Sequence, residues 1–198
     1  MHLGVFSDHL FFAFTGGLLI NSALKNPLDY NTINGAVQWG LNGDITGLAV
    51  QPGGALAIMC RSRVELIYGK NKDDFYKDVY SSDTGAKEWT VKTLSAGIYL
   101  DDRGIGQLSR TQAFGNFEYN TLSRNIRPLL STFINRAVAS VIVREKNQYR
   151  LFFDNGEGII ATFGPKGLLG WTNFSFPHTA SCSFSGEDST GKEHIYMG

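Results

Sequence analysis

Short runs of apolar residues that alternate with polar positions recur along the chain, and they come in pairs joined by turn residues. A clear pair lies at residues 97–110, where two alternating runs flank Asp102, Arg103 and Gly104. Alternation with a period of two is typical of β-strands, and Gly104 can adopt the positive φ that a tight hairpin needs. The same unit recurs at residues 9–23, 55–69 and 149–164, and a fifth begins at Glu193. The pattern therefore predicts a series of β-hairpins.

The predicted hairpins are evenly spaced. Their first residues, His9, Ala55, Gly97, Tyr149 and Glu193, are 46, 42, 52 and 44 residues apart by subtraction of residue numbers. A repeat of about 40–50 residues built from four short strands is typical of β-propeller blades. We therefore predict an all-β fold, a β-propeller-like array of antiparallel blades with four hairpin-centred blades and part of a fifth. An all-β sandwich with evenly spaced hairpins is the alternative.

Each blade needs strands beside its hairpin. Strand-like runs precede the hairpins, where they would form the innermost strand of each blade, at residues 3–7, 46–50, 91–95, 139–144 and 179–184. Outer strands are predicted at residues 37–41, 77–81 and 171–176. Residues 1–23 are almost continuously apolar, which is typical of strands covered on both faces. We therefore expect even the first blade to pack between neighbours.

One segment departs from the strand pattern. Apolar residues recur there at helical spacing, at Leu122, Ile126, Leu129, Leu130 and Phe133. Asn120 or Thr121 is placed as an N-cap, and Pro128 argues against a long uninterrupted helix. We predict a single β-propeller domain over residues 1–198, with a short helical insertion at about residues 114–136.

The predicted insertion carries Arg124, Arg127 and Arg136. These arginines are candidate contacts to a partner subunit or to passing DNA, although a solvated surface is the simpler interpretation. The whole chain has no charge bias that would indicate nucleic-acid or membrane binding, because 18 basic residues balance 18 acidic ones. Any such contact would have to be local.

The composition, 42% hydrophobic and 13% aromatic residues, is that of a globular protein. No apolar run approaches the roughly 20 residues needed to span a bilayer. The first residues lack a basic region and a small-residue cleavage site, so we predict no signal peptide and synthesis in a cytoplasm. Cys60 and Cys182 lie in predicted strands of different blades, and we interpret them as buried free thiols, with a disulfide as the alternative.

Candidate catalytic groups are sparse. Asp101, Asp102, Asp154 and Glu157 could supply the two carboxyl groups that a glycosidase places about 5–10 Å apart. All four lie at or beside hairpin turns, so turn chemistry explains them better. The four histidines show no metal-ligand spacing, and no Gly-x-Ser-x-Gly occurs. We therefore predict no catalytic residue, no metal site and no cofactor, and a protein that is not an enzyme.

Four runs in the predicted blades are distinctive: ITGLA (45–49), RVELIYG (63–69), GIYLDDRGI (97–105) and LSRTQAFG (108–115), the last leading into residues 122–126. They resemble segments of tailed-phage neck and tail proteins, the packaged-DNA stabilisation and tail-tube nozzle proteins of short-tailed phages. It covers roughly residues 45–133 and rests on the order of the repeats, without a catalytic signature.

The resemblance implies a non-enzymatic structural component of a phage or prophage tail or neck. Such a protein would form part of an oligomeric ring through which DNA is retained and ejected, in contact with copies of itself and neighbouring tail proteins. It would reside in the virion after synthesis in the bacterial host cytoplasm. The alternative is a carbohydrate-binding propeller, lectin-like or an inactive glycosidase relative, that uses Trp39, Trp89 and Trp171. These tryptophans do not occupy equivalent repeat positions, which argues against repeated sugar sites.

The fifth repeat contains only two predicted strands. A propeller closes when its first and last blades join, and an unpaired apolar strand edge promotes association with other chains. We therefore expect these residues to belong to a longer polypeptide, or another chain to cover the last strand, and the protein alone to self-associate.

Overall fold

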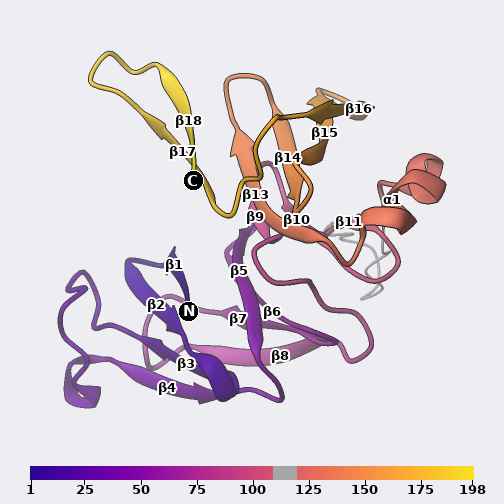
Figure 1. Cartoon of the computed structure of the whole chain (residues 1–198). Helices are drawn as coiled ribbons and strands as arrows, with labels where there is room; N and C mark the ends of the chain where they lie inside the picture. Colours follow the sequence, from indigo (N-terminus) through magenta and orange to yellow (C-terminus); the bar gives the residue numbers. More distant parts are fainter. Residues whose placement is uncertain (109–119) are drawn as a thin grey trace. The chain divides into compact units, whose positions relative to one another are not determined.

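The computed structural model describes residues 1–108 and 120–198. The chain divides into two compact units, an N-terminal unit of Met1–Gly97 and a C-terminal unit of Ile98–Gly198. Each unit is built from antiparallel sheets (Figure 1). No helix in the described part of the chain is long and apolar enough to cross a membrane.

The N-terminal unit contains two four-stranded sheets whose strands pair in the order of the sequence. The first blade consists of β1 (His2–Phe6), β2 (His9–Ala13), β3 (Leu18–Asn21) and β4 (Val37–Gly40). The second blade consists of β5 (Ile45–Gln51), β6 (Ala55–Cys60), β7 (Val64–Tyr68) and β8 (Tyr76–Ser81), and the short β9 (Lys92–Thr93) follows. Short 3-10 turns lie at Thr15–Gly17 and Thr32–Asn34.

The C-terminal unit continues the same plan. Its first strands are β10 (Gly97–Leu100), β11 (Ile105–Gln107) and β12 (Asn120–Thr121), which pair in that order. The fourth blade consists of β13 (Ala137–Val143), β14 (Gln148–Phe153), β15 (Glu157–Gly164) and β16 (Gly167–Ser175). A two-stranded sheet of β17 (Ser183–Glu187) and β18 (Glu193–Met197) follows it.

Successive sheets meet through their innermost strands. In the N-terminal unit β1 contacts β5 and β5 contacts β9, and in the C-terminal unit β13 contacts β17. Sequential up-and-down sheets joined through their first strands are the arrangement of propeller blades. The chain is therefore a β-propeller-type array, as the hairpin spacing predicted. Gly104 at the 101–104 turn has a φ of 140°, the positive value expected for that turn.

The core of the N-terminal unit lies between the first and second blades. Phe6, Phe11, Ala13 and Leu19 of the first blade pack with Ile58 and other apolar residues of the second blade. Gly47 of β5 marks a close approach, because a Cβ at this position would lie 2.5 Å from Cβ of Val91. The inner strand can therefore approach the 91–93 segment only without a side chain there.

The C-terminal unit has its own apolar cluster between β13 and the β17–β18 sheet. It contains Ala139, Val141, Val143, Phe152 and Ala180, all buried. Glu193 ties the two sheets together, since its carboxylate accepts hydrogen bonds from the Arg144 and Glu145 backbone amides, at 2.9 Å each. The pair of strands β17–β18 is thus fixed to the fourth blade by packing and by one carboxylate.

The helical insertion differs from its prediction. Residues 114–119 of the predicted range lie outside the described residues, and so does Ser109, where the predicted second hairpin strand ends. Asn120 and Thr121 form the outer strand β12 and not an N-cap. The helix itself is α1 (Arg127–Phe133), preceded by a 3-10 turn at Arg124–Ile126. Pro128 lies in its first turn, where a missing N–H costs little.

Three further predictions need correction. The inner strand predicted at 179–184 is β17, Ser183–Glu187, because the amides of Ser181 and Cys182 before it bond to the Gly198 carbonyl. The outer strand predicted at 171–176 begins already at Gly167, whose φ of 112° permits a tight turn from β15. Both cysteines are free as expected, but only Cys60 is buried and Cys182 is exposed.

Candidate functional site

The three candidate arginines lie around α1 and are all exposed. Arg136 is occupied, since its Nε lies 2.6 Å from Oδ1 of Asp154 and its carbonyl accepts the Asp154 amide. Within residues 1–108 and 120–198, Arg124 and Arg127 form no ion pair. These two arginines are therefore the ones whose charges are available to a partner.

Two of the candidate carboxylates, Asp101 and Glu157, accept hydrogen bonds within their own turns. Asp101 accepts hydrogen bonds from the amides of Arg103 and Gly104, at 2.8 and 2.9 Å, and pairs with the Arg103 side chain. Asp154 pairs with Arg136, and Glu157 accepts a bond from the Asn155 amide group at 2.7 Å. Asp102 is exposed beside the same turn as Asp101. The contacts of Asp101 and Glu157 match the turn chemistry that the sequence indicated, whereas Asp154 pairs with an arginine 18 residues away.

The tryptophans have separate local roles. Trp39 of β4 donates from Nε1 to Oδ1 of Asn21, at 3.2 Å, and packs near Phe75. Trp89 lies against the His2 ring, with ring centroids 4.6 Å apart. Trp171 lies on β16, opposite Ala161. Trp39 and Trp89 belong to the N-terminal unit and Trp171 to the C-terminal unit.

Three of the four histidines, His2, His9 and His194, have local contacts. His9 is buried and its Nδ1 donates to the Ser22 carbonyl, at 2.7 Å. His194 pairs with Asp188 at 2.8 Å in the turn between β17 and β18. Burial, the N-terminal ammonium group and Lys92 together lower the pKa of His2 to about 4. No group of metal-ligating side chains occurs among the described residues.

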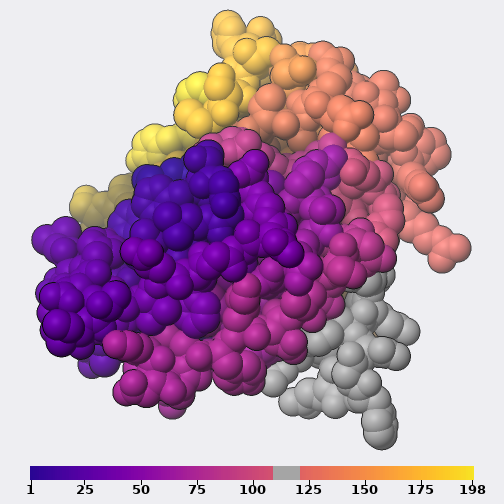
Figure 2. All heavy atoms as spheres, turned by 90° about the horizontal axis from the view of Figure 1, so that it is seen from below, coloured from indigo at the N-terminus to yellow at the C-terminus, as the bar shows by residue number. Residues whose placement is uncertain are grey.

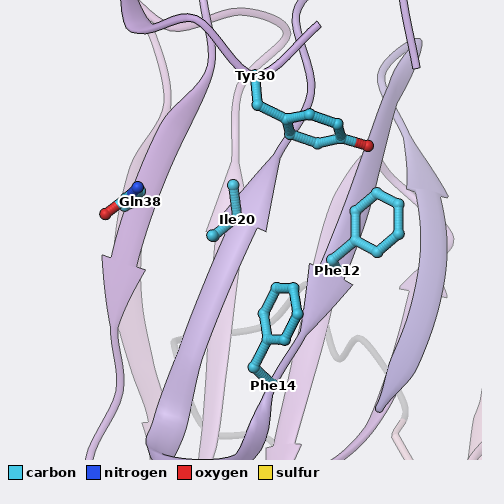
Figure 3. Close-up of a pocket in the computed structure, with 5 residues that line it drawn as sticks. All are labelled: Phe12, Phe14, Ile20, Tyr30 and Gln38. Atoms are coloured by element: carbon cyan, nitrogen blue, oxygen red, sulfur yellow. The ribbon is translucent and has the colours of Figure 1, made fainter. Parts of the chain in front are cut away.

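The first blade carries an apolar pocket on the face opposite its core (Figure 3). Phe12, Phe14, Ile20, Tyr30 and Gln38 line a cavity of about 250 Å³. Phe12 pairs with Ile20 and Ile20 with Gln38 across the strands, so all three side chains lie on one face of the sheet. The pocket is therefore a product of strand register.

Aromatic rings shape this pocket. The Phe12 ring stacks on Phe14 with centroids 6.4 Å apart and meets the Tyr30 ring edge-on at 5.5 Å. The Tyr30 hydroxyl donates to the Pro27 carbonyl at 2.6 Å, which fixes the ring in place. The two-residue period of a strand places Phe11 and Phe12 on opposite faces of the sheet. Because residues 10–13 are all apolar, the sequence did not show which of the two faces is covered.

The same blade exposes more apolar surface. Leu3 and Val5 of β1 are 56% and 67% exposed, and Phe14 and Leu18 are 37% exposed. Residues of the first blade, in indigo, lie at the surface in Figure 2. We call this set, with Phe12 and Tyr30, the open face of the first blade. Contiguous exposed apolar surface of this kind marks sites of contact with other protein surfaces.

No family model matches the sequence, and no curated protein matches it. Solved structures share its fold. The complex of BBS1N with ARL6DN matches with a TM-score of 0.54 and 12% identity, over 96% of this chain and 60% of the BBS1N chain. A luciferin-regenerating enzyme matches with a TM-score of 0.53 and 7% identity, over 96% of this chain and 65% of that one.

PorZ, a surface component of the type-IX secretion system of Porphyromonas gingivalis, has a TM-score of 0.51 and 11% identity, over 99% of this chain and 26% of PorZ. The chain thus spans about three fifths of the first two structures and a quarter of the third. Identities this low establish the shared fold alone. None of the three is a phage tail protein, and their different roles assign no activity to this chain.

Proposed function

We propose that the protein is a non-enzymatic structural subunit of a phage or prophage tail or neck. It forms part of an oligomeric ring through which DNA is retained and ejected, and it resides in the virion after synthesis in the bacterial host cytoplasm. Its partners are copies of itself and neighbouring tail proteins. Two lines of support exist, the resemblance of residues 45–133 to tail-propeller segments and the surface of the first blade.

The observation that carries the proposal is the open face of the first blade. Its apolar side chains include Leu3 and Val5, both more than half exposed, and the ring-lined pocket of Phe12, Phe14 and Tyr30. The opposite face of this sheet packs against the second blade with the same kind of residues. A surface that matches a blade-to-blade interface is suited to packing against a further sheet of the assembly.

The exposed arginines fit the same role. Arg124 lies in the 3-10 turn before α1, and Arg127 is the first residue of α1. In a ring they would contact acidic groups of a neighbour or, transiently, phosphates of passing DNA. Such contacts need no specific base recognition, and a chain without overall net charge can supply them locally.

Electron microscopy of phage particles from a culture that produces the protein tests the proposal. Gold-labelled antibody against the protein should mark the tail or neck, and purified protein should form rings in negative stain. Replacement of Val5 by Ser, which removes apolar surface from the open face, should disperse these rings, whereas Asp73→Asn on an exposed loop of the second blade should not. Label confined to material other than particles would overturn the tail assignment.

A further inference from the structure

A second cavity lies in the C-terminal unit, between α1 and one end of the fourth blade. It has a volume of about 270 Å³. The described residues that line it come from α1, β14, β15 and β16, and they are Leu129, Phe133, Phe153, Glu157, Gly158, Ile159, Asn173, Phe174 and Ser175. The cavity is distinct from the open face of the first blade.

Strand register explains why polar and apolar groups meet in this cavity. Glu157 pairs with Ser175 and Ile159 pairs with Asn173 across β15 and β16. Paired residues, and residues two apart on one strand, project from the same face of a sheet. This face therefore presents one carboxylate, one amide and one hydroxyl group beside an isoleucine.

Aromatic residues form the adjoining wall. The Phe133 ring of α1 stacks on the Phe153 ring of β14, with centroids 5.0 Å apart and an interplanar angle of 21°. Phe153 is 1% exposed, whereas Phe133 is half-buried, so Phe133 covers Phe153 and presents a ring toward the cavity. The helix thus contributes the apolar side of a site whose other side is polar.

Among the described residues that line the cavity, Glu157 is the only charged one. Its Oε2 accepts the Asn155 amide group at 2.7 Å, which fixes the carboxylate orientation. Among the described residues Oε1 has no hydrogen-bond partner. The neighbouring Asp154 is neutralised by Arg136, 2.6 Å away. One oriented, half-buried carboxylate is therefore left to attract a cation.

We propose that this cavity binds the side chain of an arginine from a partner protein. A guanidinium group is planar, pairs with a carboxylate through its N–H groups and stacks on aromatic rings, which fits Glu157 beside Phe133. Asn173 and Ser175 supply acceptor oxygens for the remaining N–H donors. The volume is below the roughly 300–1,000 Å³ of sites for drug-sized ligands and suits a single side chain. The proposal does not depend on the phage assignment.

Titration of the ¹⁵N-labelled full chain with Nα-acetyl-L-arginine amide tests this site. We expect saturable shifts of the Glu157, Gly158 and Ser175 amides, with a dissociation constant on the order of millimolar for so small a probe. Glu157→Gln, which keeps an acceptor for Asn155, should weaken binding about tenfold or more. Phe133→Leu should weaken it about threefold, while Glu145→Gln, on the exposed turn after β13, should leave it unchanged.

Two related probes sharpen the outcome. The citrulline analogue has nearly the same shape without the charge, and it should not bind. The lysine analogue should bind more weakly than the arginine probe because its ammonium group cannot stack or form a forked pair. Equal binding of the citrulline probe, tighter binding of lysine, shifts that map outside β15 and β16, or unchanged affinity in a folded Glu157→Gln variant would overturn the proposal.

Discussion

The second blade and the first blade have similar apolar sequences but differ in how many of their faces are covered. All six residues of β6, Ala55–Cys60, are buried, including neighbours that point to opposite faces. In β2 of the first blade, burial alternates, with Phe11 fully buried and Phe12 only partly so. An apolar strand can therefore be buried on both faces, but the neighbouring sheets determine whether both faces are covered.

The largest expected effect comes from the two faces of β2. Phe11→Ala should lower the free energy of unfolding by about 3–5 kcal/mol, because the Phe11 ring packs against Phe6 and Phe75 in the core and its loss leaves a cavity. Phe12→Ala, its neighbour on the partly exposed face, should cost about 1 kcal/mol. Urea denaturation followed by circular dichroism measures both. Equal losses would mean that the open face is covered in solution.

The blades also differ in the polar groups that they bury. The second blade buries Glu65, whose side chain is 2% exposed and pairs with Arg63 at 2.9 Å and Lys77 at 2.7 Å. Lys77 also donates to the Gly40 carbonyl of the first blade, at 3.0 Å. The first blade buries Asn21 and His9 instead. Lys77 of β8 thus links the ion pairs of the second blade to β4 of the first blade.

Glu65→Gln should therefore cost about 1–3 kcal/mol of unfolding free energy, the range for leaving a buried polar group without its partner. The loss falls below that of Phe11→Ala because Arg63 and Lys77 are 27% and 30% exposed and water can solvate them in the variant. Asp73→Asn, on an exposed loop of the same blade, serves as the control and should change stability by less than about 0.5 kcal/mol. A loss no greater than that of the control would show that the pairs contribute nothing net.

The hairpins were predictable because local chemistry determines them. Alternation marked the strands, and Gly104 with its positive φ marked a turn, so the observed strands begin within a few residues of their predicted positions. The predicted strand at 179–184 failed for a non-local reason. The amides of Ser181 and Cys182 bond to the Gly198 carbonyl, and the strand begins only at Ser183. Nothing near residue 180 in the sequence indicates that partner.

The candidate sites were harder to predict than the hairpins, because they depend on strand pairing and helix packing between residues distant in the sequence. Sequence analysis singled out Glu157 as a turn carboxylate, and its contact with Asn155 agrees. It could not show that Glu157 lies beside Ser175, 18 residues away, or that α1 places Phe133 next to them, because register and helix packing are tertiary properties. The open face was missed for the same reason, since Phe12 and Phe11 are identical as residues and differ only in what covers them.

The β17–β18 sheet is a third case, because both packing and the carboxylate of Glu193 attach it to the fourth blade. Burial alone would raise the pKa of Glu193, but hydrogen bonds from Ser185 and from the Arg144 and Glu145 amides outweigh it, so the pKa is lowered. A lowered folded-state pKa means that the stabilisation is present above the ordinary value of 4.5 and is lost as the pH falls through the folded-state value.

We therefore expect the amide resonances of Arg144 and Glu145 to move toward the positions of amides without a hydrogen bond as the pH falls below about 4.5. The free energy of unfolding should fall by less than about 1 kcal/mol, because the site is partly exposed. Glu193→Gln should remove this pH dependence while it leaves the β13–β16 resonances folded. If the two amides titrate equally in the variant, another carboxylate is responsible.

The smallest expected effect, on reactivity and not on stability, comes from the thiols. Cys60 ends β6 in the second blade, where burial, followed by the charge of Glu65, raises its pKa to about 11. Cys182 is exposed just before β17. Because the thiolate is the reactive form, an aromatic disulfide reagent at pH 8 should modify one thiol per native chain and two in denaturant. Cys182→Ser should remove the fast reaction, whereas Cys60→Ser should preserve it. Fast modification of Cys60 in the native protein would mean that the second blade opens readily. The complete burial of β6 would then not make the second blade more resistant to opening than the first.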